Sequence, residues 1–312
     1  MSNILVKTNN LTKGEWYKWR NKGIGGSDVA AICGLNKYKS PVQLWMEKTE
    51  QIAAEEAGEA AYFGTILEPI IKMEFTKRTS LPIRNVKAIL KHPIYSFMLA
   101  NLDGVVKDPI HDKCIFEAKT ASAFKQEQWE NGIPEEYMLQ VQHYMAVTGY
   151  QKAYVAVLIG GNHFKYKVID KDEEIIQMII KLEENFWNHV LNNTPPPLDG
   201  SQASSELLSR LYPSSKNTSE LLLPDEAFNL ICSYELAKEH EKQASEMKDE
   251  AANKLKSMLG SNEKGIIKDK IVSWKSIFSE RVDTKKLQIE MPDIYNKYLS
   301  KSNSRRFSIK LY

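Results

Sequence analysis

The chain has 312 residues, of which 42% are hydrophobic and 26% are charged. These proportions are ordinary for a globular protein and exclude a fibrous or intrinsically disordered chain. Its 42 Lys and Arg residues against 40 Asp and Glu residues give a formal net charge of +2, so any basic surface for nucleic acid must be local.

No apolar run approaches the roughly 18 residues needed to cross a bilayer. The first ten residues lack the charged-then-apolar order of a signal peptide. We therefore expect a cytoplasmic protein without membrane contact, in the bacterial host if a phage or prophage encodes it. Three cysteines lie far apart among apolar neighbours, which predicts reduced thiols rather than a zinc site or a four-cysteine iron-sulfur cluster: Cys33, Cys114 and Cys232.

Two helices with a glycine-rich turn between them are predicted near the N-terminus. A capping-box pattern at Thr12 predicts a helix that extends through Arg20. Residues 23–28 read Gly-Ile-Gly-Gly-Ser-Asp and precede an apolar run, so we expect Ser27 or Asp28 to cap a second helix. Backbone N–H groups at such a helix start bind phosphate, and Arg20 would add a forked donor suited to a terminal phosphate. A purely structural turn is the alternative.

Two further helices follow. Ser40 and Pro41 predict the start of one of them, and apolar residues at helical spacing from Leu67 to Phe75 predict the other, with Glu68 among them. A carboxylate among apolar neighbours is costly to bury without a partner, and a metal-bound water would be such a partner. A partly exposed first-turn glutamate, favoured by the helix dipole, is the alternative.

Residues 97–119 predict a β-hairpin. Two apolar runs, 97–106 and 114–116, are separated by turn-forming residues. If the turn is centred between Ile110 and His111, Asp103 lies opposite Ala118 in an antiparallel ladder.

Chemistry gathers on one face of this hairpin. Side chains alternate at period two, so Glu117 and Lys119 project from the same face, and Asp103 lies between them. Asp103 and Glu117 can hold a hard divalent cation such as Mg²⁺ that the scissile phosphate also touches. Lys119 is placed to position or activate the attacking water. A cross-strand surface ion pair is the alternative.

The chain then alternates helices and strands up to a run of three prolines at 195–197. Helices are predicted over 122–130, 134–148 and 173–191, and paired strands over 153–159 and 164–169. The composition predicts three parts, namely a core over 1–197, a linker or extended arm over 198–225 and a C-terminal region over 226–312.

The C-terminal region is predicted to hold a helix over 228–259, with an apolar seam for packing on another helix or subunit, and short strands over 265–276 and 305–311. From Glu226 onward, 17 Lys and Arg residues stand against 13 Asp and Glu residues. Three arginines are candidate contacts to DNA or a partner, with a solvated surface as the alternative: Arg281, Arg305 and Arg306.

These motifs form an ordered set that covers about residues 12–195. The set comprises Trp16, Arg20, Gly-Gly-Ser27-Asp28, Gly64, Glu68, Leu102-Asp103-Gly104, Glu117-Ala118-Lys119, Tyr137, Gln140, Gln142 and Tyr144. It resembles the YqaJ-type viral recombinases, phage exonucleases similar to lambda exonuclease within the PD-(D/E)XK nuclease superfamily. The resemblance implies an α/β, restriction-endonuclease-like fold: a central mixed sheet flanked by helices, with a helical and β-hairpin C-terminal appendage.

The resemblance also implies a role for each site residue. Asp103 and Glu117 would be metal ligands together with the Ala118 carbonyl. Lys119 would be the water-activating base or an electrostatic partner, and Gln140 would orient Lys119 or the water. Glu68 would contact a water or a second metal ion.

By the same resemblance, Arg20, Ser27 and Lys125 would bind a 5′-phosphate. Two positions depart from the family pattern. Leu102 stands where the superfamily name has proline, and Lys125 stands roughly where the lambda enzyme has an arginine. A lysine keeps the charge but loses the bidentate fork.

The expected activity is Mg²⁺-dependent 5′-to-3′ exonuclease digestion of linear double-stranded DNA ends. Two ions would act per site, Mn²⁺ would substitute, and a 3′ single strand would remain for a RecT-like annealing protein. The family likeness implies a homo-oligomer, a ring-shaped trimer. The alternatives are an endonuclease or nickase of the same superfamily and a non-catalytic scaffold that binds DNA ends and loads a recombinase.

Overall fold

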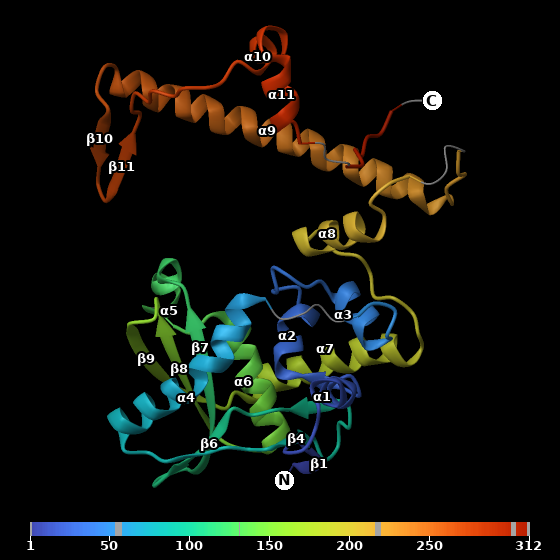
Figure 1. Cartoon of the computed structure of the whole chain (residues 1–312), viewed down its shortest axis with the longest axis vertical. Coiled ribbons are helices and arrows are strands. Elements are labelled where there is room, and N and C mark those ends of the chain that lie inside the picture. Colours follow the sequence, from blue (N-terminus) through green and yellow to red (C-terminus); the bar gives the residue numbers. More distant parts are fainter. Residues whose placement is uncertain (1, 54–57, 131, 216–219, 301–303, 311–312) are drawn as a thin grey trace. The chain divides into compact units, whose positions relative to one another are not determined.

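The computed structural model describes residues 2–53, 58–130, 132–215, 220–300 and 304–310. The chain divides into two compact units, residues 1–211 and 212–312 (Figure 1). The first unit contains both sheets that position the candidate site. Each unit is described by itself.

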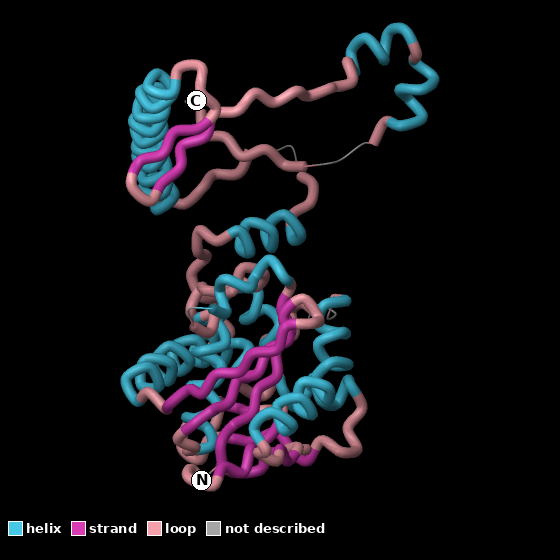
Figure 2. The backbone as a smooth tube through the Cα atoms, turned by 90° about the vertical axis from the view of Figure 1, so that its left-hand side faces the viewer, coloured by secondary structure: helices cyan, strands magenta, loops and turns pink. Residues whose placement is uncertain are grey.

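A five-stranded mixed sheet forms the centre of the first unit. Its strand order is β3(Ile83–Arg84), β6(Gly104–Asp108), β7(Asp112–Ala121), β8(Lys152–Ile159) and β9(His163–Asp170). Strands β7 and β8 run parallel, and the other neighbours are antiparallel. Helices lie on both sides of these strands (Figure 2).

A second, four-stranded sheet has the order β1(Asn3–Lys7), β4(Ala88–Lys91), β5(Met98–Ala100) and β2(Ile24–Gly25). The single strand predicted over 97–106 is therefore wrong, since β5 and β6 belong to different sheets. The cause is the pairing: β5 lies between β4 and β2, whereas β6 lies between β3 and β7. Residues 101–103 connect the two sheets and bring Asp103 to their junction.

The hairpin of β6 and β7 is shifted by one residue from the predicted register. Gly104 pairs with Phe116, so the line of pairing extends to Asp103 opposite Glu117 rather than Ala118. Local turn chemistry explains the shift. The Asp108 carboxylate accepts hydrogen bonds from the N–H groups of Ile110 and His111 (2.7 and 2.9 Å), which centres the turn on Ile110.

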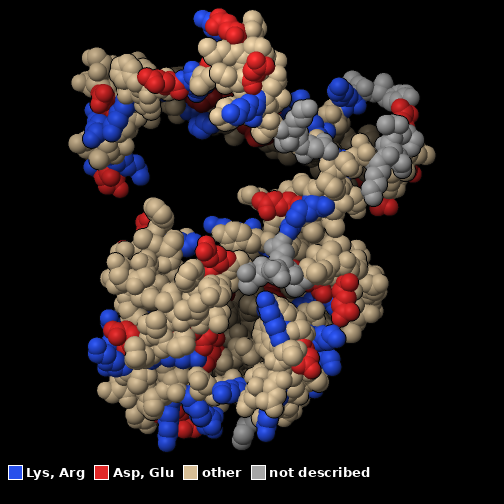
Figure 3. Space-filling view, in the orientation of Figure 1, with Lys and Arg blue, Asp and Glu red and all other residues tan. Residues whose placement is uncertain are grey.

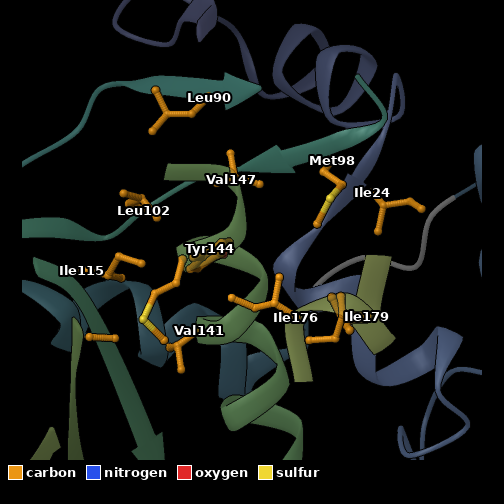
Figure 4. Close-up of a cluster of buried hydrophobic side chains, with 14 of the residues drawn as sticks. Ile24, Leu90, Met98, Leu102, Ile115, Val141, Tyr144, Val147, Ile176 and Ile179 are labelled. Carbon is orange, nitrogen blue, oxygen red and sulfur yellow. The ribbon is translucent and has the colours of Figure 1, made fainter. Parts of the chain in front are cut away.

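The predicted alternation of side chains along β7 is present and separates two hydrophobic clusters. Phe116 packs with Phe75 of α4(Glu59–Thr79) on one face of the sheet. Ile115 joins the larger cluster on the other face, with Val141 of α6(Glu135–Thr148) and Ile176 of α7(Glu173–Leu191) (Figure 4). Because Glu117 and Lys119 share a face with Ile115, they point towards α6.

The other helices of the first unit follow the predictions closely near the N-terminus. The capping box at Thr12 starts α1(Lys13–Arg20), and Ser40 caps α3(Pro41–Lys48). The N-cap of α2(Gly26–Ile32) is Gly25, not Ser27 or Asp28, because the Asp28 carboxylate reaches back to the Gly25 N–H. The helix predicted over 122–130 is a 3₁₀ turn, η1(Ala123–Lys125), followed by α5(Gln126–Glu130).

The compact first unit extends past the predicted boundary at 197. Helix α8(Gln202–Leu211) lies inside the predicted linker and packs on α3. Ala203 and Leu207 of α8 are buried, and the Arg210 side chain donates to Gln43 Oε1 at 3.2 Å. Apolar residues in a Ser- and Pro-rich stretch thus form an amphipathic helix whose burial depends on α3, which composition alone does not reveal.

The second unit contains α9(Glu226–Leu259), the hairpin of β10(Lys264–Ile267) and β11(Lys270–Ser273), α10(Thr284–Glu290) and α11(Pro292–Tyr298). The strand predicted over 305–311 is absent from residues 304–310, and α10 and α11 were not predicted. Of the helices described, none is long and apolar enough to cross a membrane. Charged side chains of both signs are interspersed on the face of each unit that Figure 3 shows.

Because the first unit extends to Leu211, we expect alanine substitutions of two adjacent leucines in α8 to affect its stability differently. Leu207→Ala removes a side chain that is 2% exposed, and we expect it to destabilise the first unit by about 2–5 kcal/mol through the cavity it leaves. Leu208, 39% exposed, is the matched control, and its alanine variant should cost about 0.5 kcal/mol or less. Urea denaturation monitored by tryptophan fluorescence measures both. Equal destabilisation by the two substitutions would indicate that α8 is part of the linker and not of the packed first unit.

Candidate active site

Asp103 and Glu117 meet where the two sheets join. Asp103 precedes β6, and its Oδ2 accepts a hydrogen bond from the Ala118 N–H at 2.8 Å. Glu117 lies on β7 with its side chain 4% exposed. Strand β7 therefore holds the Asp103 carboxylate through the Ala118 N–H and carries Glu117 itself. The two carboxylates lie close together as predicted, although the register is shifted.

Lys119 and Gln140 complete a hydrogen-bonded triangle with Glu117. Lys119 Nζ donates to Glu117 Oε1 at 2.8 Å and to Gln140 Oε1 at 2.9 Å. Gln140 Nε2 donates to Glu117 Oε1 at 2.7 Å. The Lys119 ammonium also lies 4.7 Å from the centre of the Tyr137 ring, a favourable cation–π contact. Helix α6 thus supplies two of the groups that hold Lys119.

The pKa values of Asp103 and Lys119 are both raised, but for different reasons. Burial raises the pKa of Asp103 well above its usual range, and the carboxylates of Glu117 and Glu68 add to that shift. Burial alone would lower the pKa of Lys119, but the charge and hydrogen bond of Glu117, together with the Asp103 carboxylate and Tyr137, outweigh burial and raise it. Lys119 is consequently an ammonium at neutral pH.

The residues present fit a hard cation. Glu117 Oε2 is buried and has no hydrogen-bond partner among the described residues. Glu117 and Asp103 both line a cavity of about 640 Å³, together with Ala118 and Glu68. Within the described ranges, no three His, Cys, Asp and Glu side chains form a ready-made metal cluster. Two carboxylates in a roomy cavity suit Mg²⁺, which keeps several of its waters.

Glu68 lines the same cavity but is engaged elsewhere. Its Oε1 accepts from Lys72 Nζ, one helical turn further along α4, at 2.5 Å. Lys72 Nζ also donates to Asn85 Oδ1 at 3.0 Å. Lys72 was not predicted to be part of the site, although its i,i+4 spacing from Glu68 on a helix indicates an ion pair.

Arg20 and Ser27, both predicted to bind a 5′-phosphate, are in direct contact. Arg20 Nη2 donates to Ser27 Oγ at 2.5 Å, and the guanidinium lies 5.4 Å from the centre of the Trp16 ring. Both line a cavity of about 190 Å³ whose wall also contains Asp103 and Glu117. The two parts of the candidate site are thus neighbours.

Lys125 lines the 640 Å³ cavity and a second one of about 560 Å³ that Ser27 also lines. The remaining candidates, Arg281, Arg305 and Arg306, are exposed residues of the second unit.

Asp28 and Lys48 are the main functional candidates that sequence reasoning missed. Arg20 Nη2 donates to Asp28 Oδ1 at 3.1 Å, and Lys48 Nζ lies 2.8 Å from Asp28 Oδ2. From the sequence, Asp28 was predicted as a helix cap and belonged to the Gly-Gly-Ser27-Asp28 motif, but it was given no role in binding. Lys48 carries no local signal, because its partner is twenty residues earlier and the contact depends on how α2 packs on α3.

Comparison with known proteins identifies the family of this chain. A family model described as the YqaJ-like viral recombinase domain matches residues 15–151. The uncharacterized protein YqaJ of Bacillus subtilis (strain 168) is 44% identical over 312 residues, which are 98% of this chain and 97% of that protein.

A solved structure shares the fold of most of this chain. An alkaline exonuclease of Laribacter hongkongensis, LHK-Exo, superposes with a TM-score of 0.50 at 22% identity, over 64% of this chain and 98% of that one. A phage-related exonuclease of Haemophilus somnus 129PT gives 0.44 at 15% identity, over 55% of this chain and 96% of that one, which is too low to support an argument.

The likeness to LHK-Exo confirms the predicted fold, a mixed α/β arrangement with helices flanking the sheets. The identity with the Bacillus protein extends over both units. This chain therefore belongs to the family of YqaJ-like viral recombinases.

Proposed function

We propose that the chain is a metal-dependent exonuclease that digests linear double-stranded DNA from a 5′ end and leaves a 3′ single strand. The observation that carries the proposal is the 190 Å³ cavity, whose lining includes Arg20 and Ser27 as well as Asp103 and Glu117. A terminal phosphate bound by Arg20 would lie beside the carboxylates, so cleavage would occur near the strand end. Family membership and a fold shared with a protein named an alkaline exonuclease support this proposal.

Asp103, Glu117 and the Ala118 carbonyl would hold Mg²⁺, with Mn²⁺ as a substitute. When bound, the ion supplies charge compensation for the phosphate oxygens and lowers the pKa of a bound water. Glu68, which also lines the 640 Å³ cavity, would contact a second ion or its water. Two observations support a cation at this site. Glu117 Oε2 has no hydrogen-bond partner among the described residues, and burial together with the neighbouring carboxylates raises the pKa of Asp103.

The cationic state of Lys119 favours an electrostatic role over that of a resting base. Two of its three N–H donors are engaged by Glu117 and Gln140, which leaves one for a water or a phosphate oxygen. Preorganised charge of this kind stabilises the negative charge that develops during phosphodiester hydrolysis. Gln140 holds the ammonium in place because its amide bonds both Lys119 and Glu117.

The proposal extends to the assembly. A ring-shaped trimer that retains DNA, and transfer of the 3′ strand to a RecT-like annealing protein, rest on the family resemblance alone. The exposed arginines of the second unit, Arg281, Arg305 and Arg306, are candidates for contacts to DNA or to that partner.

Replacing Lys119 tests the electrostatic role. Lys119→Met should lower the rate of digestion of linear duplex DNA by about 100-fold or more, because it removes the fixed positive charge. Binding of the same duplex in chelator, measured by fluorescence anisotropy, should change little. Lys113→Met, at an exposed position of the same strand β7, is the control and should keep full activity. Equal activity of the two variants would remove Lys119 from the mechanism.

End-labelled DNA tests the reaction class. We expect the unmodified protein in Mg²⁺ to release a 5′-terminal label before an internal one, and to leave covalently closed circular DNA intact. Chelation should abolish digestion, since two carboxylates and a lysine alone do not activate water sufficiently.

Other outcomes identify the alternatives. Cutting of closed circles would indicate an endonuclease or nickase. Binding of DNA ends with no digestion in Mg²⁺ or Mn²⁺ would indicate a scaffold.

A further inference from the structure

A buried ion pair lies directly behind the Arg20 guanidinium. The Asp28 and Lys48 side chains are 5% and 2% exposed, and Lys48 Nζ lies 2.8 Å from Asp28 Oδ2. Neither residue lines the 190 Å³ cavity, so neither can touch a phosphate bound there. Any effect they have on a ligand must therefore pass through residues that line the cavity, and Asp28 contacts two of these, Arg20 and Gly25.

The carboxylate of Asp28 is fully engaged. Its Oδ1 accepts from Arg20 Nη2 at 3.1 Å, and its Oδ2 accepts from the Gly25 N–H at 3.1 Å in addition to the Lys48 contact. Lys48 Nζ also donates to the Arg20 backbone carbonyl at 3.4 Å. The pair therefore joins the end of α1, the start of α2 and the last turn of α3.

The electrostatics agree with a permanently ionised Asp28. Burial would raise its pKa, but the Lys48 and Arg20 cations lower it far below its usual range. One carboxylate between two cations leaves the cluster with a net charge of +1 (two positive charges and one negative). That remaining charge is available to a phosphate at Arg20.

The contacts also decide which donors Arg20 can offer. Among the described residues, the two hydrogen bonds of its side chain, to Ser27 Oγ and Asp28 Oδ1, both use Nη2. Its Nε and Nη1 donors are left for a ligand, as is the Ser27 hydroxyl hydrogen. A guanidinium held at one nitrogen presents the rest of its fork in a fixed direction.

We propose that Asp28 and Lys48 are positioning residues that hold Arg20 for recognition of a terminal phosphate, and so set the preference of the protein for 5′-phosphorylated DNA ends. This inference rests on the proposed binding of a 5′-phosphate at Arg20. A rival explanation is that the cluster attracts phosphate through its net charge alone. The two explanations predict different outcomes for charge-matched variants.

The decisive variant is the double substitution Asp28→Asn with Lys48→Met. It removes one charge of each sign, so the cluster keeps its net charge of +1 and no unpaired lysine is left buried. Arg20, however, loses the carboxylate that holds it. Positioning predicts that the preference for phosphorylated ends is lost, whereas net charge predicts that it is kept.

The probe is a blunt DNA duplex with either a 5′-phosphate or a 5′-hydroxyl. The ratio of the two dissociation constants, measured by fluorescence anisotropy in chelator, is the readout. We expect the unmodified protein to prefer the phosphorylated end and the double variant to lose about tenfold of that preference, the effect typical of a hydrogen bond to a charged group.

Glu47→Gln is the matched control. Glu47 is a buried carboxylate of α3 paired with Lys39 (2.5 Å), and it makes no contact to Arg20 among the described interactions. The preference of this variant for phosphorylated ends should stay within about twofold of that of the unmodified protein, because the substitution alters no hydrogen bond to Arg20.

Asp28→Asn alone provides a second, independent comparison. It raises the net charge of the cluster from +1 to +2 (two cations without the carboxylate), so net charge predicts a stronger preference and positioning predicts a weaker one. Circular dichroism and thermal melting establish which variants fold, and either folded variant decides between the explanations.

Three results would overturn the inference: an unmodified protein without phosphate preference, variants of Asp28 that keep it, or a Glu47→Gln variant that loses it equally. Digestion of the same duplexes in Mg²⁺ separates this inference from the proposed activity. Preference in binding without digestion would uphold the positioning role and contradict the exonuclease, whereas digestion without preference would do the opposite.

Discussion

The first unit depends on one buried carboxylate. Glu117 Oε1 accepts hydrogen bonds from Lys119 and Gln140 at 2.8 and 2.7 Å, while Oε2 is buried without a partner among the described residues. Burying an acceptor without a hydrogen bond is costly, and proteins tolerate it mainly where a ligand or ion completes the site. Helix α6 supplies Gln140 and also packs Val141 into the core, so the packing of this helix and the geometry of the site cannot change independently.

The 190 Å³ cavity that Arg20 and Ser27 line also depends on helix α6. A Cβ at Gly26 would lie 2.5 Å from Tyr144 Cε1, so only glycine allows α2 to approach α6 this closely. Ser27 follows Gly26 directly, and the Tyr144 hydroxyl accepts from Gln140 Nε2 at 3.1 Å. The two halves of the site are therefore connected by packing and hydrogen bonds that run from Ser27 to Glu117. A fixed relation between a terminal phosphate and the carboxylates is what stepwise cleavage from an end requires.

Sequence reasoning succeeded where the signal is local. The alternation along β7 predicted that Glu117 and Lys119 share a face, and the capping box predicted α1. It failed where tertiary contacts decide. The apolar run 97–106 forms two strands because β5 and β6 pair with different neighbours. The predicted register was wrong by one residue because hydrogen bonds to the Asp108 carboxylate, which a pattern of apolar residues does not reveal, determine the turn. Lys48 and helix α8 were missed because their burial depends on elements distant in sequence.

We propose that Asp103 and Glu117 together hold a divalent cation. Binding of Mn²⁺ to the unmodified protein and to the Asp103→Asn and Glu117→Gln variants, monitored by electron paramagnetic resonance of the free ion, tests this proposal. We predict that each variant weakens Mn²⁺ binding by about tenfold or more, since each removes a charged oxygen ligand from the same site. Unchanged Mn²⁺ affinity in both folded variants would contradict the account, because the carboxylates would then have no ion to share.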